Sequence, residues 1–145
     1  MAPRLLDCTD PRPVHFVGIA GAGMSALAEL FVRRGVAVTG CDASLVSADD
    51  FRRLGVEVQQ GHDAAHVAGA RALVITSAMP KDHPELVAAR ARGLPIVRRA
   101  EALGEAVSGG TLVAVAGTHG KTTTTVMTTD ALAAAGMAPT GVVGG

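Results

Sequence analysis

One stretch, residues 112–125, constrains the fold of this chain more than any other. It reads Leu-Val-Ala-Val-Ala-Gly-Thr-His-Gly-Lys-Thr-Thr-Thr-Thr. Five apolar residues in a row are typical of a strand that is buried on both faces. A strand, a glycine loop and a helix in that order form a phosphate cradle, because loop amides and the helix N-terminus face the same anion. The stretch therefore predicts a site for the phosphates of ATP.

Within this loop the residue types match the chemistry of a bound triphosphate. The eight-residue form of the phosphate loop needs glycine at position 115, where this chain has Val115, so the match is to the shorter G-T-H-G-K-T. Lys121 is expected to reach the outer phosphates and to be the catalytic residue, and the Thr122 hydroxyl to coordinate Mg²⁺. The predicted ATP-binding residues are Gly117, Thr118, His119, Gly120, Lys121, Thr122 and Thr123.

The chain before this loop repeats one unit, a Val-rich run followed by a glycine or polar turn and a helical segment. The candidate strands are Val14–Gly18, Val36–Gly40, Val56–Gln60, Ala72–Thr76, Pro95–Val97 and Leu112–Ala116. Strands that alternate with helices predict a parallel sheet with helices on both faces. The predicted fold class is α/β, a Rossmann-like sheet followed by the first strand, phosphate loop and helix of a truncated second α/β domain.

Composition shifts divide the chain into three parts. Residues 1–13 hold three prolines and no periodicity, which predicts a mobile leader. Ser108-Gly-Gly110 resembles a linker, so residues 14–108 are predicted to form one domain and residues 109–145 the incomplete start of another. Helix ends are predicted at Arg33-Arg34-Gly35, Leu54-Gly55 and Gly93, helix starts at Ser47–Asp50 and at Asp82 or His83, and a further helix over Arg99–Val107.

Composition also excludes several classes of partner. Thirteen Lys and Arg balance thirteen Asp and Glu, so no net charge favours nucleic acid or an anionic membrane surface. Three Phe, without Trp or Tyr, leave no platform for base stacking. Cys8 and Cys41 do not have metal-ligand spacing, and two thiols fit a reducing cytoplasm. No signal peptide or membrane-inserted segment is expected, since polar residues and prolines interrupt the apolar windows.

A second glycine loop follows the first predicted strand. Compared with G-x-G-x-x-G, it has Gly18, Ala20 and Gly23 at the three positions, with an additional Gly21 beside the middle one. Asp42 lies nineteen residues after Gly23, at the end of the next strand, where a carboxylate can accept from ribose hydroxyls. The loop predicts a site for a nucleotide diphosphate and does not distinguish NAD from other such ligands.

Other polar residues follow the strands at the edge where such sheets bind ligands. His62 follows the third strand and Ser77 the fourth, and each is equally well explained as an ordinary turn residue. Arg98-Arg99 precedes the last helix of the domain, where the pair can neutralise a phosphate or remain solvated.

Two phosphate-type loops about a hundred residues apart resemble the Mur ligase family of peptidoglycan synthesis, which builds the bacterial cell wall. The matching segments are His15–Ser25, Val38–Asp42, Gly61-His62, Val74–Glu85, Arg98–Glu101 and Ala116–Thr125. The resemblance implies a first domain that binds UDP-N-acetylmuramic acid through Gly18, Ala20, Gly21, Ala22, Gly23, Met24, Ser25, Asp42, His62 and Ser77. It also implies that ATP and Mg²⁺ bind at Gly117–Thr123.

The resemblance further implies an ATP-dependent ligase that joins L-alanine to the sugar's carboxylate through an acyl phosphate. On that view the chain holds the UDP-sugar part and the ATP loop. The remaining central and C-terminal domains of the polypeptide are missing, and the chain alone is expected to be catalytically incompetent.

Three alternatives stay open. A fragment of an NAD(P)-dependent oxidoreductase would bind NADH at the first loop but leaves the second loop unexplained. A non-catalytic nucleotide-sensing module would be complete at this length, and the sister ligase that attaches a tripeptide would bind the same UDP-sugar.

Overall fold

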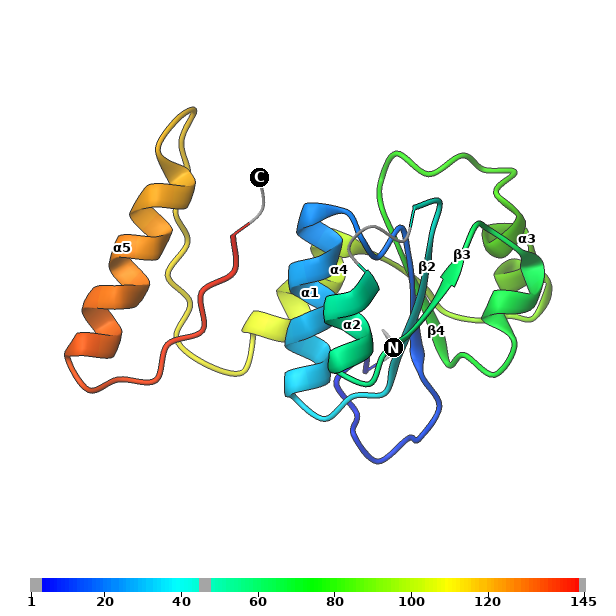
Figure 1. Cartoon of the computed structure of the whole chain (residues 1–145), viewed down its shortest axis with the longest axis horizontal. Helices are drawn as coiled ribbons and strands as arrows, with labels where there is room; N and C mark the ends of the chain where they lie inside the picture. Colours follow the sequence, from blue (N-terminus) through cyan, green and yellow to red (C-terminus); the bar gives the residue numbers. More distant parts are fainter. Residues whose placement is uncertain (1–3, 45–47, 144–145) are drawn as a thin grey trace.

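The computed structural model describes residues 4–44 and 48–143. Five strands and their intervening helices form one α/β unit, and a long helix, α5, stands beside it (Figure 1). The strands are β1 (Val14–Val17), β2 (Val38–Asp42), β3 (Glu57–Gln60), β4 (Ala72–Ile75) and β5 (Ile96–Arg98). The helices are α1 (Ala22–Arg33), α2 (Ala48–Arg53), the 3₁₀ turn η1 (Ala64–Val67), α3 (Pro84–Ala91), α4 (Arg99–Val107) and α5 (Lys121–Ala134).

The sheet is parallel throughout, with strand order β3-β2-β1-β4-β5. The chain winds outward from β1 to β3, then returns to β4 on the other side of β1 and continues to β5. This reversal between β1 and β4 is the topological switch point, outside which open α/β sheets bind their ligands. The predicted α/β class with a parallel sheet is therefore confirmed.

The larger core lies between the sheet and helices α1, α2 and α4. Side chains alternate along a strand, so Val14 and Phe16 of β1 point to this face. Phe16 meets Phe31 of α1 edge-to-face, with ring centroids 5.4 Å apart. Leu27 and Leu30 of α1 complete the centre of this layer. Burial of this apolar stripe supplies most of the free energy that holds α1 on the sheet.

The opposite face of the sheet is covered by α3 and η1. Val17 of β1 and Leu73 of β4 pack there against Val67, Leu86 and Ala89. The same face also carries His15 and Cys41, so it is less apolar than the first. Helices thus cover both faces, as the near-continuous apolar strands predict.

The predicted helix ends are largely confirmed. Helix α1 ends at Arg33, and Gly35 follows with a φ of +79°, a left-handed conformation that favours glycine. Helix α3 starts at Pro84 after His83, whose side chain makes no capping hydrogen bond. Helix α4 spans the predicted residues, Arg99–Val107. Ser47, predicted to start α2, lies outside the described residues.

The N-terminal segment differs from the predicted mobile leader. Leu5 is 1% exposed and belongs to the larger core. The Arg71 guanidinium donates to the carbonyl oxygens of Arg4, Leu5 and Asp7 at 2.8–3.1 Å. The Leu6 amide donates to Glu105 of α4 at 3.0 Å. The segment is therefore fastened by contacts far along the chain, which local composition does not reveal.

Arg71→Ala is expected to detach this segment. It removes three hydrogen bonds from a charged donor, a loss of roughly 1.5–3 kcal/mol in unfolding free energy. Urea unfolding measures that loss, and limited trypsin digestion is expected to cut faster after Arg4, whose carbonyl Arg71 holds. Arg53→Ala, at an 81% exposed side chain, is the control and is expected to change neither. Unchanged stability of Arg71→Ala would show that the buried Leu5 side chain and the Leu6–Glu105 hydrogen bond hold the segment without Arg71.

The strand predicted over Leu112–Ala116 is not formed among the described residues. Leu112 and Val113 are 59% and 61% exposed, and α5 buries none of its residues. A strand needs a neighbour to pair its backbone groups, and no described strand lies beside this segment. Residues 137–143 turn back along α5, and Val142 touches the larger core (Figure 1).

None of the described helices combines the length and the apolar character required to cross a bilayer.

Candidate functional site

The first glycine loop lies at the switch point, directly after β1. Its backbone amides are mostly committed to internal hydrogen bonds. Gly18 and Ile19 donate to the Cys41 carbonyl at 2.9 and 3.0 Å, and Gly21 donates to Gly18 at 3.1 Å. Gly18 has a φ of +71°, so a glycine is required there for the turn itself.

Two amides at the start of α1, those of Ala22 and Gly23, have no hydrogen-bond partner among the described residues. Met24 and Ser25 both donate to the Gly21 carbonyl, at 2.9 and 2.8 Å, which closes the first turn of the helix. Ala22 and Gly23 are its first two residues, where no carbonyl of the same helix can reach the amides. Gly21, the N-cap, has no side chain to cap them. The N-terminus of α1 is therefore open to an anion.

Arg99, the first residue of α4, adds a full positive charge at this point. A methyl group built on Gly23 would approach the Arg99 guanidinium carbon to 2.9 Å, so the guanidinium lies directly against this glycine. Within the described part of the chain, no acid pairs with Arg99. A cation beside the positive end of a helix is electrostatically unfavourable until an anion joins them. The pair is suited to a diphosphate.

Asp42, predicted to bind a ribose, serves first as a brace for the loop. Its Oδ2 accepts from the Ala20 amide at 3.0 Å, and its Oδ1 accepts from the Ser44 amide at 3.1 Å. A carboxylate has about four acceptor positions, so two remain for ribose hydroxyls. The structure thus places Asp42 and Ala20 together, and the methyl of Ala20 leaves this bond intact.

The remaining predicted residues of the first site divide into two groups. Ser77 is exposed in the turn after β4, and Ser25 bonds through its hydroxyl to the Ala22 carbonyl at 2.9 Å. Met24 is 2% exposed and its amide is already bonded, so it holds the loop from the core and presents no group to a ligand.

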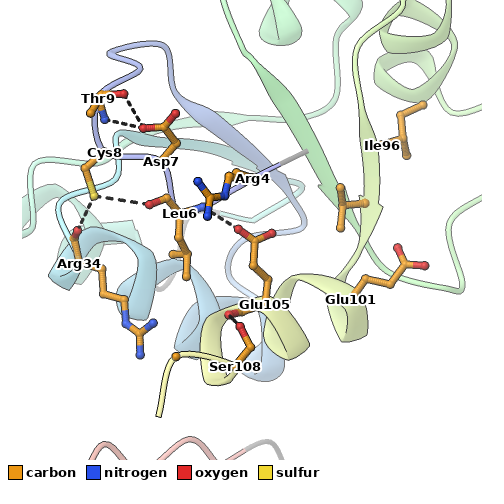
Figure 2. Close-up of a pocket in the computed structure, with 12 residues that line it drawn as sticks. Arg4, Leu6, Asp7, Cys8, Thr9, Arg34, Ile96, Glu101, Glu105 and Ser108 are labelled. Atoms are coloured by element: carbon orange, nitrogen blue, oxygen red, sulfur yellow. Dashed lines mark hydrogen bonds between the residues drawn. The ribbon is translucent and has the colours of Figure 1, made fainter. Parts of the chain in front are cut away.

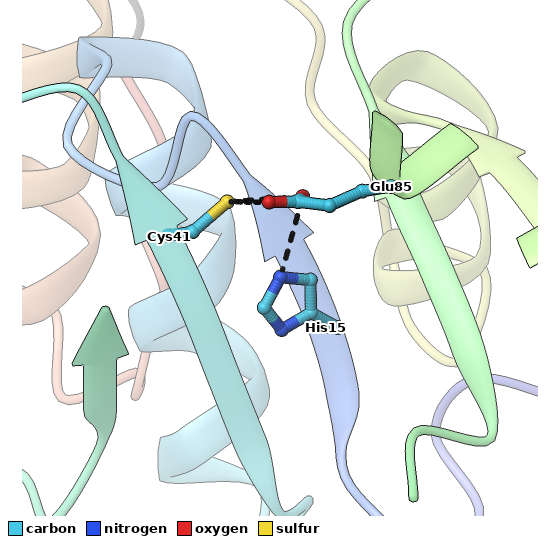
Figure 3. Close-up of side chains that lie close together, drawn as sticks. All are labelled: His15, Cys41 and Glu85. Carbon is cyan, nitrogen blue, oxygen red and sulfur yellow. Dashed lines mark hydrogen bonds and ion pairs between the residues drawn. The ribbon is translucent and has the colours of Figure 1, made fainter. Parts of the chain in front are cut away.

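His62 is drawn into a buried polar cluster that the sequence did not reveal. Its Nδ1 lies 3.4 Å from Cys41 Sγ and 3.6 Å from Glu85 Oε1, and its ring packs on His83 with centroids 4.6 Å apart. Glu85 is completely buried, and Cys41 donates to it at 3.0 Å (Figure 3). His66 Nδ1 also lies 3.0 Å from the Glu85 carboxylate.

The cluster keeps Glu85 ionised. Burial alone would raise the pKa of Glu85, but His15, Cys41 and His66 around the carboxylate outweigh it and lower that pKa to about 2. Burial raises the pKa of the Cys41 thiol, and the hydrogen bond to Glu85 raises it further. Cys41 is therefore a protonated donor in the structure and not a reactive thiolate.

The second glycine loop has the elements of a phosphate cradle. Gly120 is the N-cap of α5, with φ +76° and ψ 2°, a conformation that favours glycine. No side chain caps α5, so the amides of Lys121 and the next two residues have no partner within the helix. Lys121 Nζ reaches back to the Thr118 carbonyl at 3.5 Å, over the loop. Thr122 is exposed at the helix start. These residues fit ATP phosphates and Mg²⁺.

A broad open pocket lies elsewhere on the molecule (Figure 2). The residues that line it include Arg4 and residues 6–9 of the N-terminal segment. Arg34, after α1, and Glu101 and Glu105 of α4 also line it. Arg34 is at the other end of α1 from the glycine loop, about 18 Å away along a twelve-residue helix. Neither predicted loop contributes to this pocket.

The site residues predicted from the sequence omit several groups that the structure brings together. In the sequence, Arg99 was noted only as part of the Arg98-Arg99 pair, which could equally be solvated. Its approach to Gly23 depends on how α4 packs on α1, and the sequence does not show this packing. His15, Cys41 and Glu85 are separated by up to seventy residues, and only the alternation of β1 indicates that His15 faces away from Phe16.

Comparison with known proteins gives one consistent family. Residues 13–111 match the Mur ligase family, catalytic domain. A UDP-N-acetylmuramate–L-alanine ligase from Clavibacter michiganensis is 54% identical over 138 residues, which are 94% of this chain and 29% of that protein. The protein with the same name from Bradyrhizobium diazoefficiens is 51% identical over 134 residues, 92% of this chain and 29% of its own length.

Solved structures agree with this. A UDP-N-acetylmuramate:L-alanyl-γ-D-glutamyl-meso-diaminopimelate ligase from Neisseria meningitides has a TM-score of 0.81 at 35% identity, over 90% of this chain and 42% of that chain. A UDP-N-acetylmuramate–alanine ligase from Thermotoga maritima has a TM-score of 0.78 at 34% identity, over 83% of this chain and 29% of that chain. The chain spans about 29% of the length of the curated relatives it matches.

Proposed function

Because the chain belongs to the Mur ligase family, we propose that it is the UDP-sugar-binding part and ATP phosphate loop of a UDP-N-acetylmuramate–L-alanine ligase. The whole enzyme would act in the cytoplasm, in peptidoglycan synthesis, and would join L-alanine to UDP-N-acetylmuramic acid. The proposal that the chain binds the UDP-sugar is supported by the Arg99 guanidinium, which lies against Gly23 beside the uncapped N-terminus of α1. An anion with two linked phosphates is the ligand that such a pair of positive groups favours.

The residues of the first site would divide the ligand between them. The amides of Ala22 and Gly23 and the guanidinium of Arg99 would hold the diphosphate. Asp42 would accept from the ribose while it braces the loop through Ala20. Ser77, exposed at the end of β4, would contact the sugar side of the crevice. UDP-N-acetylmuramate is also the part that the names of both similar ligases share.

The second loop would hold the phosphates of ATP. When bound, ATP supplies the phosphoryl group that turns the sugar's carboxylate into an acyl phosphate, which the amine of L-alanine can attack. Lys121 would neutralise charge on the outer phosphates, and the Thr122 hydroxyl would bind Mg²⁺. Because α5 and residues 112–116 bury almost nothing against the described part of the chain, turnover is expected to need further residues to enclose this loop.

A second candidate is the ligase that attaches a whole peptide to the same sugar. The fold supports this candidate as strongly as it supports the alanine ligase, because the Neisseria protein has a TM-score of 0.81 and the Thermotoga protein 0.78. The curated relatives at 54% and 51% identity carry the alanine name, and this favours the alanine ligase. Both candidates share the first site, so a test of UDP-sugar binding applies to either.

Calorimetric titration of the chain with UDP-N-acetylmuramic acid tests the proposal. Wild-type chain is expected to bind, and Arg99→Ala is expected to bind about 10-fold or more weakly, because a charge-assisted hydrogen bond contributes roughly 1.5–3 kcal/mol. Arg90→Ala, an arginine of α3 bonded to Lys81, is the control and should bind as wild type. Absence of heat at millimolar ligand, or a lower dissociation constant for NADH than for the UDP-sugar, would contradict the proposal.

A further inference from the structure

The buried face under α3 holds a set of donors that the proposed ligase chemistry does not use. His15 comes from β1, Cys41 from β2 and Glu85 from the first turn of α3, and all three are fully buried. One donor atom from each lies within 4.8 Å of the others (Figure 3). Imidazole, thiolate and carboxylate are together the ligand types of protein zinc sites.

His15 carries the second observation that points to a ligand. Its Nε2 is buried and has no hydrogen-bond partner, since the nearest Glu85 oxygen is 3.6 Å away. Its Nδ1 lies 3.0 Å from Thr39 Oγ1. A hydroxyl on Nδ1 fixes the ring so that Nε2 faces the cluster, which is how the outer partners of metal-binding histidines orient them.

His62, in the loop after β3, lies beside two of these three donors, Cys41 and Glu85. Ligands on a tetrahedral zinc ion are about 3.3–3.6 Å apart, given bonds of about 2.0–2.3 Å. His62 Nδ1 lies 3.4 Å from Cys41 Sγ and 3.6 Å from Glu85 Oε1. The His62 side chain is 31% exposed, which gives an ion a route to the otherwise closed site.

We propose that His15, Cys41 and Glu85 bind one zinc ion and that the adjacent His62 imidazole supplies the fourth ligand. The charges support this, because a Cys thiolate and a Glu carboxylate neutralise Zn²⁺ and the two imidazoles stay neutral. Binding releases the thiol proton of Cys41 to solvent and replaces its hydrogen bond to Glu85 with two metal bonds. The ion would join β1, β2, α3 and the loop after β3, so its role is structural. It is separate from the Mg²⁺ proposed at Thr122.

The test uses the chain without a polyhistidine tag, stripped with a chelator, given one equivalent of zinc and dialysed. Elemental analysis is expected to find about one zinc per chain. Cobalt in place of zinc should give thiolate-to-metal charge-transfer absorption. Cys41→Ser is expected to lose both signals, and Cys8→Ser, at the exposed cysteine, to keep both. His62→Gln, at a partly exposed ring, should lower zinc affinity 10–100-fold.

Should Cys41→Ser fail to fold, the wild-type chain decides the question, because its melting temperature is expected to rise by several degrees with equimolar zinc. A folded wild-type chain that retains less than a tenth of an equivalent of zinc would overturn the proposal. So would a cobalt band that disappears with Cys8→Ser. In either case the cluster would be a hydrogen-bond network around Glu85 and nothing more.

Discussion

Ala22→Asp is expected to abolish binding of UDP-N-acetylmuramic acid by the chain while slightly stabilising its fold. Ala22 is exposed at the first position of α1, whose first turn holds no acidic residue. A carboxylate there favours the helix by about 0.3–1 kcal/mol, because it complements the positive end of the helix dipole. The same carboxylate can accept from the free amides and pair with Arg99, so it occupies the place of a phosphate. A loss of at least 100-fold in affinity is expected from calorimetry.

The matched control places the same charge on the other loop. Thr122→Asp adds a carboxylate to the first turn of α5, which also lacks an acidic residue, and is expected to leave UDP-sugar affinity unchanged. Thermal unfolding of both variants shows whether each remains folded. Equal affinity of Ala22→Asp and wild type would mean that the ligand does not reach the N-terminus of α1.

Phe31→Ala is expected to destabilise the fold strongly. Phe31 is 0% exposed and packs edge-to-face on Phe16 at the centre of the larger core. Removing a buried ring from a close-packed site typically costs about 3–5 kcal/mol, through lost burial and the cavity left behind. This is a large part of the total stability of a domain of this size. Urea unfolding measures the change.

Val87→Ala is the control for this substitution. Val87 lies on α3 and is 50% exposed, so its truncation is expected to change the unfolding free energy by less than about 0.5 kcal/mol. A cost below about 1 kcal/mol for Phe31→Ala would mean that α1 is not packed on the sheet as described, and that the glycine loop is not held by it.

The parts of the fold that sequence predicts are those set by local pattern. Val-rich runs, the glycine after α1 and Pro84 at the start of α3 all act over a few residues. The elements they predict before residue 108 are found within two residues of the predicted bounds, whereas the strand predicted over residues 112–116 is not formed in the part of the chain that the structure describes. The strand order needed the structure, because nothing local states that β4 returns to pair with β1. The prolines of the N-terminal segment indicated mobility, yet Leu5 and Arg71, sixty-six residues apart, fasten it.

The same limit applies to the candidate site. The glycine loop and Asp42 follow a spacing pattern, and the structure places them in contact through the Ala20 amide. Arg99 follows no such pattern, because it reaches Gly23 only through the packing of α4 on α1. Residues 112–116 show the reverse case. Their apolar run predicts a strand, but a strand also requires partners, and the described residues provide none.

Amide NMR of the isotope-labelled chain during titration with UDP-N-acetylmuramic acid tests most directly whether the N-terminus of α1 binds the diphosphate. The signals of Ala22 and Gly23 are expected to shift strongly and saturably, with smaller changes at Ala20 and Asp42. The amides of α5 should stay where they are. Shifts that cluster around the pocket of residues 4–9 and Arg34, with Ala22 and Gly23 unmoved at saturation, would contradict this assignment.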